Sequence, residues 1–211
     1  MILYHGSNII VNKPLFGYGK PYNDYGQGFY CTEDEELAKE WACSSPTGGF
    51  VSVYNLDTKG LNILSLNGKN ILEWLAILIK NRQIRYSSPV EKQIADYIID
   101  KYFLDYSSFD VIIGYRADDS YFSFVRAFLS NTISLEQLSD AMKLGNLGMQ
   151  VFIQSQKAFD NLSFLESEPV FNDYYVKRVE RNNMAREDYY RLLEKTVTSQ
   201  TFARDIIKRE V

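Results

Sequence analysis

Apolar and polar residues alternate along this chain with two different periods, and each period predicts one kind of element. A period of two, or a short apolar run, predicts strands at 2–5, 29–31, 50–56, 109–114 and 150–154. Apolar residues near every third or fourth position predict helices at 34–42, 71–81, 91–103, 121–130, 135–144 and 157–162. No regular strand–helix–strand repeat links these elements, so we predict the α+β class.

Polar residues mark the expected helix starts and one long loop. Residues 12–28 are rich in Gly, Pro and Asn and predict a loop, and loops of this length are often functional. Thr32 is followed three residues later by Glu35, which is a capping-box pattern, so Thr32 is expected to cap the first helix. Ser134 and Ser155 are expected to cap two later helices in the same way.

The chain changes character after Phe164. The remaining residues are highly charged but nearly balanced, and their apolar positions predict one or two amphipathic helices. We therefore divide the chain into a domain at 1–165 and a helical C-terminal appendage at 166–211. The appendage is expected either to bind a partner or to pack on the domain, in which case its buried face is Val176, Val179, Tyr189, Leu192, Leu193 and Ile206.

Composition and charge narrow the classes of function. The chain has 211 residues with 23 basic and 27 acidic side chains, and the net charge of −4 excludes a chain-wide basic surface for nucleic acid. One His and two Cys cannot make a zinc cluster or a disulfide framework. The longest apolar run, 71–79, is too short for a membrane span, and the N-terminal sequence predicts no signal peptide. We expect a cytoplasmic protein with no metal and no membrane partner.

Three short motifs carry candidate chemistry, although each has a structural interpretation as well. His5 ends a predicted strand directly before Gly6 and Ser7, where it could simply be hydrogen-bonded. Gly26 and Gly28 precede the strand at 29–31, and glycines there let the backbone approach a ligand closely. Trp41 lies eleven residues after Tyr30 and could belong to the core. Neither the Rossmann nor the P-loop glycine motif occurs.

In this order and spacing, the motifs resemble the ADP-ribosyltransferase superfamily, in the branch shared by poly-ADP-ribose polymerases and diphtheria toxin. More narrowly, the chain resembles a family of bacterial proteins that share the segments Tyr4–Ser7, Asp24–Thr32, Trp41–Ala42, Ala117–Asp119 and Gln150. The resemblance spans residues 2–164. It implies a split antiparallel β-sandwich with surrounding helices, followed by the helical tail, and it implies NAD⁺ as co-substrate.

The resemblance also implies a role for each motif residue. Tyr30 and Trp41 would form two aromatic walls around the nicotinamide ring of NAD⁺. Backbone atoms of Gly6 would bind the nicotinamide carboxamide, so Gly6→Val is expected to abolish NAD⁺ binding without unfolding the protein. His5, assisted by Ser7, would hydrogen-bond a hydroxyl of the adenosine ribose.

The third position of the family is usually Glu, whose carboxylate bonds the nicotinamide ribose and stabilises its cationic transition state. We place Gln150 there, and Gln154, which shares the strand face, is the second choice. The alternative is that Gln150 begins a strand at the surface. An amide carries no formal charge, so Gln150→Glu is expected to raise the rate of glycosidic cleavage.

Four further residues are candidates for contacts at the rim of the site. Asp118 and Asp119 follow a buried strand and would order a loop or receive the acceptor, unless they form a solvated turn. Arg82 and Arg116 are candidates for the pyrophosphate by charge alone, and each has the alternative of an ordinary surface arginine.

The expected function is therefore an NAD⁺-dependent mono-ADP-ribosyltransferase, a glycosyltransferase that releases nicotinamide. Its acceptor would be a protein, a nucleic acid or a small molecule. A toxin-like role, with a cognate antitoxin or regulator as partner, is one possibility. The alternatives are an NAD⁺ glycohydrolase, a non-catalytic module that binds NAD⁺ or ADP-ribose, and an interaction protein that works through its tail.

Overall fold

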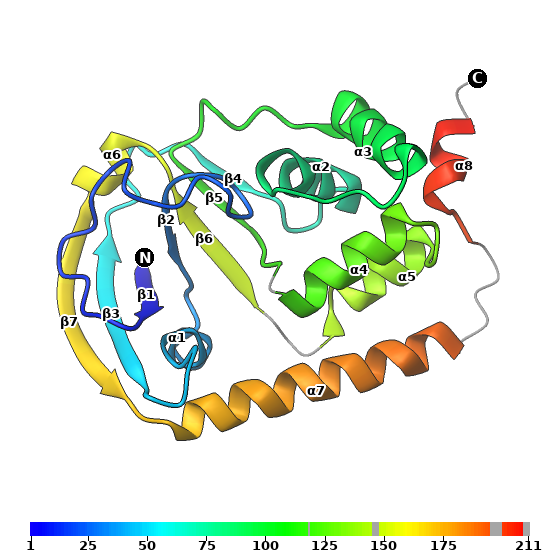
Figure 1. Ribbon diagram of the computed structural model, residues 1–211. Coiled ribbons are helices and arrows are strands. Elements are labelled where there is room, and N and C mark those ends of the chain that lie inside the picture. Colours follow the sequence, from blue (N-terminus) through cyan, green and yellow to red (C-terminus); the bar gives the residue numbers. More distant parts are fainter. Residues whose placement is uncertain (118, 145–147, 195–199, 209–211) are drawn as a thin grey trace. The chain divides into compact units, whose positions relative to one another are not determined.

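The computed structural model describes residues 1–117, 119–144, 148–194 and 200–208 (Figure 1). Within these residues the strands form two sheets and no barrel, and helices are interspersed among them. This arrangement confirms the α+β class that the sequence predicts.

The chain divides into two compact units. The first contains both sheets and consists of residues 1–67, 105–116 and 147–181. The second is built from helices, as far as the structure describes it, and consists of residues 68–104, 117–146 and 182–211. The chain passes between the units several times, so the predicted division at residue 165 does not coincide with either unit.

The first sheet has the strand order β1-β3-β7 and is antiparallel throughout. Its strands are β1 (Ile2–Ser7), β3 (Gly49–Leu56) and β7 (Leu162–Val170). We predicted β1 and β3 but not β7, whose last residues were assigned to the helical appendage. The reason is that β7 is an edge strand in which only Val170 is buried, so its sequence lacks the apolar alternation of a half-buried strand.

The second sheet has the strand order β2-β6-β5-β4. Its strands are β2 (Phe29–Cys31), β6 (Met149–Ile153), β5 (Val111–Tyr115) and β4 (Ile63–Ser65). The pairs β2–β6 and β6–β5 are antiparallel, but β4 runs parallel to β5. The expectation of antiparallel sheets is therefore wrong for β4. This strand has three residues, which are too few to show a period in the sequence.

One apolar cluster joins the facing sides of the two sheets. It combines side chains of β1 and β3 with side chains of β2, β5 and β6, and it includes Ala158 of helix α6 (Gln156–Asp160). Its buried members are Leu3, Cys31, Tyr54, Leu56, Val111, Val151, Ile153 and Ala158. Both cysteines of the chain are buried and free. The two sheets thus share a core, which fixes the positions of β1 and β2.

Helix α1 (Glu35–Ala42) packs on the other side of the first sheet, through Ala38 and Ala42. Its N-cap is Asp34, whose Oδ1 accepts the N–H of Leu37 at 3.1 Å. The predicted cap at Thr32 is wrong. The hydroxyl of Thr32 is buried and instead donates to the carbonyl oxygen of Met149 at 3.1 Å, so it links β2 to the start of β6.

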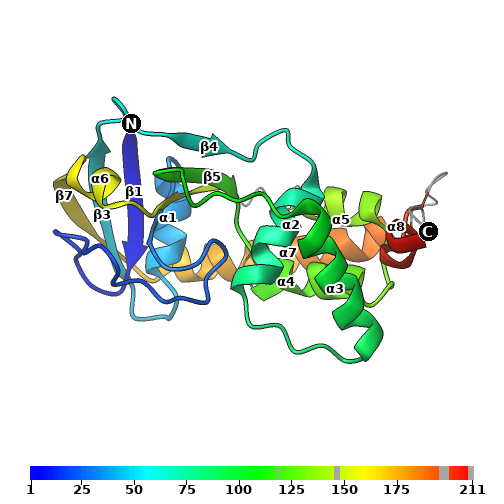
Figure 2. The same cartoon turned by 90° about the horizontal axis from the view of Figure 1, so that it is seen from above.

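The second unit gathers the helices α2 (Ile71–Asn81), α3 (Pro89–Tyr102), α4 (Asp119–Leu129), α5 (Leu135–Ala141) and α8 (Ala203–Lys208), as Figure 2 shows. Helix α3 contacts α2, α4 and α8. The bounds of α2 are those that the sequence predicts. None of the described helices is long and apolar enough to cross a membrane.

Two of the predicted helix caps are confirmed. The hydroxyl of Ser134 accepts the N–H of Gln137 at 3.2 Å, and the side chain of Gln137 accepts the N–H of Ser134 at 2.9 Å. Ser155 caps α6 by accepting the N–H of Ala158 at 3.0 Å. Both helix starts were recognisable because a cap acts over three residues of local sequence.

Helix α7 (Asp173–Glu194) is the long helix of the predicted tail, but its buried face is narrower than predicted. Val176, Val179 and Leu193 are 54%, 39% and 36% exposed, so their predicted burial is wrong. Leu192 is buried, as is Ile206 of α8. Tyr189 is half-buried and stacks on Phe124 of the second unit, with ring centroids 4.2 Å apart.

Gly6 allows β1 and α1 to approach each other closely. A Cβ atom at Gly6 would lie 1.9 Å from the carbonyl oxygen of Ala38 and 2.6 Å from the nitrogen of Ala42. Both atoms belong to the helix backbone and cannot move aside without moving the helix. The expectation that Gly6→Val leaves the fold intact is therefore wrong, because any side chain at this position separates α1 from the sheet.

We predict that Gly6→Ala lowers the free energy of unfolding by about 3 kcal/mol or more, since the added methyl group overlaps the backbone of α1. The matched control is Gly17→Ala, because Gly17 has a φ of +77° but a methyl group there would meet no atom within 4 Å. Gly17→Ala should lower the free energy of unfolding by only about 1–2 kcal/mol, because alanine is strained in a left-handed backbone conformation. Equal losses in urea denaturation would show that the contact with α1 does not constrain Gly6.

Candidate functional site

In the described chain, the two sheets of the first unit meet at one isolated bridge, between Tyr4 and Thr32. Each residue donates its N–H to the carbonyl of the other, at 2.8 and 2.9 Å. If this antiparallel ladder continued, Gly6 would pair next with Tyr30. Instead, Nδ1 of His5 lies 2.7 Å from the carbonyl oxygen of Tyr30 and uses that acceptor. The imidazole thus ends the ladder after one bridge.

The backbone of Gly6 is consequently left open on this edge of β1. Its N–H and C=O point the same way as those of Tyr4, because groups two residues apart in a strand lie on the same side. Within the described residues, no hydrogen bond to either group of Gly6 is found. An unpaired donor and acceptor on one residue are what a bound amide requires.

The hydrogen bond to Tyr30 also sets the state of the His5 ring. A carbonyl oxygen can only accept, so Nδ1 carries the proton and Nε2 of the neutral ring is an acceptor. Burial lowers the pKa of His5 below its ordinary value of 6.5, and the bond to Tyr30 offsets this only in part. The ring packs on Phe29, with centroids 4.5 Å apart. At neutral pH, His5 therefore presents a hydrogen-bond acceptor.

Tyr30 is held in place at both ends of its side chain. Its hydroxyl donates to the carbonyl oxygen of Gly26 at 2.7 Å and accepts the N–H of Tyr25 at 3.1 Å. Its ring packs on Phe152 of β6, with centroids 4.8 Å apart. Gly28 has a packing role here, because a Cβ atom would lie 2.4 Å from the Phe152 ring. The predicted role of Gly28 in approaching a ligand stays a prediction.

Trp41 lies on α1 and stacks on a cation. The guanidinium carbon of Arg116 is 4.8 Å from the centre of the Trp41 ring, and Nε1 of Trp41 is buried without an acceptor among the described residues. No ring contact between Trp41 and Tyr30 is found in the described chain. A nicotinamide ring stacked between the two side chains would need them about 7 Å apart, which is two stacking distances. The absence of a direct contact therefore does not contradict the two walls, and they stay a prediction.

Gln150 is buried rather than at the surface, so the alternative of a surface strand residue is wrong. Its side-chain nitrogen donates to Oδ2 of Asp24 at 2.9 Å and to the carbonyl oxygen of Tyr115 at 3.0 Å. Gln150 shares its face of β6 with Phe152 and hence with the ring of Tyr30. Asp24 is only 5% exposed. It belongs to one of the sequence motifs, but its motif alone predicts no role for it.

Gln154 and Ser7 have structural partners. The side-chain nitrogen of Gln154 donates to the carbonyl oxygens of Tyr106 and Phe109, at 2.7 and 2.6 Å. These two bonds fix the position of the segment before β5. The hydroxyl of Ser7 donates to the carbonyl oxygen of Ile9 at 2.6 Å in an exposed turn. The predicted roles of Gln154 and Ser7 stay predictions.

The remaining candidates belong to the second unit. Arg82 donates to the carbonyl oxygen of Ala117 at 2.6 Å, and its guanidinium carbon lies 5.5 Å from the centre of the Phe122 ring. Asp118 lies outside the described residues. Asp119 begins α4, and its side chain also lies outside the described part of the chain. The predicted roles of these residues stay predictions.

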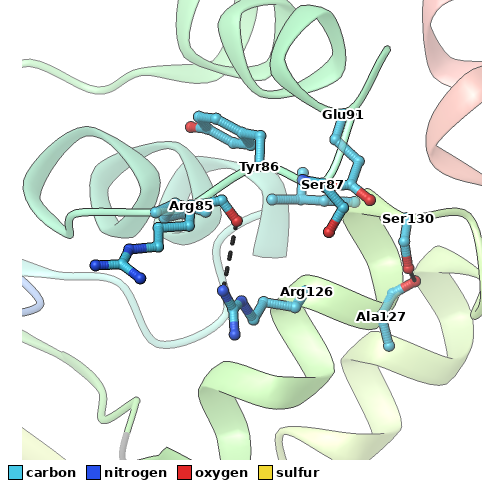
Figure 3. A pocket seen from close by; sticks show the side chains of 9 residues that line it. Arg85, Tyr86, Ser87, Glu91, Arg126, Ala127 and Ser130 are labelled. Carbon is cyan, nitrogen blue, oxygen red and sulfur yellow. Dashed lines mark hydrogen bonds between the residues drawn. The ribbon is translucent and has the colours of Figure 1, made fainter. Parts of the chain in front are cut away.

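The second unit has a hollow of about 270 Å³ of its own, shown in Figure 3. Arg85 and Arg126 line it, and Arg126 points toward the carbonyl oxygen of Arg85 at 3.4 Å. Glu91 also lines it, and its carboxylate accepts the N–H of Ser87 at 2.7 Å. None of the residues predicted for the site lines this hollow. In the described part of the chain, no group of three His, Cys, Asp or Glu side chains could hold a metal ion.

Comparison with known proteins identifies a family that covers most of the chain. The model of a family described as "Protein of unknown function (DUF3990)" matches residues 1–164. No curated protein matches the chain, and no solved structure does. The matched residues include His5, Asp24, Tyr30, Trp41 and Gln150, so the candidate site lies within the family region.

We predict that the single histidine titrates below pH 6.5 in the folded protein and carries its proton on Nδ1 when neutral. Because the unfolded chain binds this proton more readily, the free energy of unfolding should fall as the pH drops through about 6.5. Nitrogen NMR of labelled histidine reports the tautomer and the pKa directly.

The control for this titration is His5→Asn, whose amide can still donate to Tyr30 but does not titrate. The variant should lose the part of the pH dependence that His5 contributes. A histidine pKa at or above 6.5, or a proton on Nε2, would contradict the arrangement of His5 described above.

Proposed function

Because the chain belongs to the DUF3990 family, whose description names no activity, we propose its function from its own site. We propose an NAD⁺-dependent mono-ADP-ribosyltransferase that releases nicotinamide, with a first unit of the split two-sheet type found in ADP-ribosyltransferases. The observation that carries the proposal is the open backbone of Gly6 beside His5. Two sheets that meet at the bridge between Tyr4 and Thr32 support the proposed fold.

The carboxamide of nicotinamide matches the open edge at Gly6. The carboxamide has one carbonyl oxygen and one NH₂ group, and Gly6 offers one N–H and one C=O on the same strand edge. The ligand would pair with Gly6 as a further strand pairs with a sheet edge. Gly6 has no side chain, and the backbone of α1 occupies the space that a Cβ atom there would need.

The aromatic and polar groups around Gly6 match the rest of the nicotinamide riboside. The nicotinamide ring in NAD⁺ is flat and cationic, so aromatic faces such as those of Tyr30 and Trp41 attract it. Arg116 already stacks a planar cation on Trp41, so the indole face is suited to such a group. Nε2 of His5 is an acceptor suited to a ribose hydroxyl, because a hydroxyl can donate to it.

The reaction breaks the bond between C1′ of the ribose and the nicotinamide nitrogen. The electron pair of that bond leaves with nicotinamide, which becomes neutral, and the ribose becomes cationic. A nucleophilic atom of the acceptor then forms the new bond to C1′ and releases its proton. With water as acceptor, the same site is an NAD⁺ glycohydrolase. Residues that hold the two halves of NAD⁺ in position lower the barrier by orientation alone.

A non-catalytic module that binds NAD⁺ or ADP-ribose is the second candidate function. One observation favours it: the third position carries an uncharged amide, and both hydrogens of that amide are used by Asp24 and Tyr115. Such a site could still bind the ribose through the oxygen of the amide, but it would stabilise a developing cation less than a carboxylate does.

We predict that purified protein incubated with NAD⁺ releases nicotinamide, measured by chromatography, because the proposed contacts orient NAD⁺ for cleavage of its glycosidic bond. Calorimetric titration with NAD⁺ separates the candidates. Release identifies a transferase or glycohydrolase, and the fate of radiolabelled ADP-ribose in a cell extract then identifies the acceptor. Binding without release identifies the binding module. Absence of both would contradict the proposal.

We also predict that NAD⁺ quenches the fluorescence of Trp41 by stacking on it. The chain has two tryptophans, and the other, Trp74, is buried in α2 of the second unit. Trp41→Phe should therefore abolish the quenching while binding weakens by no more than about tenfold, since an aromatic wall is retained. Quenching of equal size in Trp41→Phe would show that the nicotinamide lies elsewhere.

A further inference from the structure

Asp24 and Gln150 form a buried pair whose orientation is fixed by chemistry. Nε2 of Gln150 faces two oxygens, those of Asp24 and of the Tyr115 backbone, at 2.9 and 3.0 Å. Turning the amide over would place Oε1 against a carboxylate and a carbonyl, with no hydrogen between them. Oε1 therefore points away from both, and no hydrogen bond to it is found in the described part of the chain.

The segment that carries Asp24 is built to hold it against the second sheet. Tyr25, the next residue, donates its hydroxyl to the carbonyl oxygen of Tyr115 at 2.8 Å. A Cβ atom at Gly114 would lie 2.2 Å from that hydroxyl, so the glycine makes room for it. Tyr106 donates its hydroxyl to the carbonyl oxygen of Tyr25 at 3.0 Å. These contacts together position this stretch of the loop.

The carboxylate of Asp24 accepts from the amide of Gln150 at 2.9 Å. The pair joins residues 126 positions apart in the sequence, so its geometry is set by the tertiary fold. The carboxylate accepts from Nε2 of Gln150, and this bond increases the partial negative charge on Oε1 of the same amide. The reason is that hydrogen bonds in a chain strengthen one another.

We propose that Asp24 is a positioning residue that supplies the negative charge of the site, acting through Gln150. This inference rests on the proposed function. Asp24 holds Nε2 inward and makes Oε1 a stronger acceptor for the hydroxyl of the nicotinamide ribose. As the glycosidic bond breaks and its electron pair leaves with nicotinamide, the ribose becomes cationic, and the contact with Oε1 strengthens.

The same geometry explains why an amide rather than a carboxylate stands at residue 150. A glutamate there would face the carboxylate of Asp24 and the carbonyl of Tyr115 across the distances of 2.9 and 3.0 Å without a donor. Like charges at this distance disfavour joint ionisation. The sequence-based expectation that Gln150→Glu raises the rate is therefore reversed. The single substitution places a second carboxylate next to that of Asp24 and so adds repulsion.

The test compares Asp24→Asn, Gln150→Glu and the double variant Asp24→Asn/Gln150→Glu with the wild type. Asparagine keeps the shape of Asp24 and accepts from Gln150, so only the charge is lost. Asp24→Asn should lower kcat for nicotinamide release at least tenfold while KM for NAD⁺ changes less than threefold. Gln150→Glu should also lower kcat. The double variant restores one carboxylate and one amide, and it should be more active than either single variant.

Asp57→Asn is the matched control, because it removes the same charge from an exposed residue of the first unit and should leave kcat unchanged. Thermal melting checks that each variant is folded. If Asp24→Asn alone does not fold, the role of Asp24 is tested by comparing kcat of the double variant with kcat of Gln150→Glu. Wild-type activity in Asp24→Asn, or a double variant no more active than the better single variant, would overturn the role of Asp24. Absence of release by the wild type would instead overturn the proposed function.

Discussion

The hydrogen bond from Nδ1 of His5 to the carbonyl oxygen of Tyr30 is the constraint on which the candidate site depends. It uses the acceptor that Gly6 would need to continue the ladder between β1 and β2. The two sheets therefore touch at one bridge and then separate, and the backbone of Gly6 is left open within the described structure. The same bond fixes the tautomer of His5. One contact thus leaves an open backbone edge and an oriented acceptor next to each other.

Close packing places the other groups around this edge. Because Gly6 has no side chain, α1 lies directly against β1, and the helix begins soon after the bridging residue Thr32. Trp41 is therefore positioned by helix geometry relative to Tyr30, without a contact between the two rings. On the other side, Phe152 supports Tyr30, and Gln150 on the same face is held by Asp24. Each candidate group belongs to an element whose position is set by packing.

Much of the fold could be predicted from the sequence because its signals are local. Helix α2 and the caps at Ser134 and Ser155 depend on residues within one or two turns. Strands β4 and β7 could not be predicted, because one has three residues and the other is an exposed edge. The predicted cap at Thr32 was wrong because Asp34, two residues later, accepts the N–H of Leu37 and caps the helix.

The site was predicted less completely for the same physical reason. His5, Tyr30, Trp41 and Gln150 could be named from short motifs, but the packing role of Gly6 depends on the backbone of α1. The partnership of Asp24 with Gln150 likewise depends on tertiary contact. A sequence shows that such residues are unusual, but only their neighbours show whether a glycine serves a ligand or a helix.

The open edge at Gly6 is tested most directly by following its backbone N–H with NMR in protein labelled at glycine. In the free protein this N–H should exchange quickly with solvent, since it has no partner in the described structure. Saturating NAD⁺ should shift its resonance downfield and slow its exchange, because the carboxamide oxygen becomes its acceptor. Slow exchange before NAD⁺ is added, or a Gly6 resonance unchanged at saturation, would contradict the account.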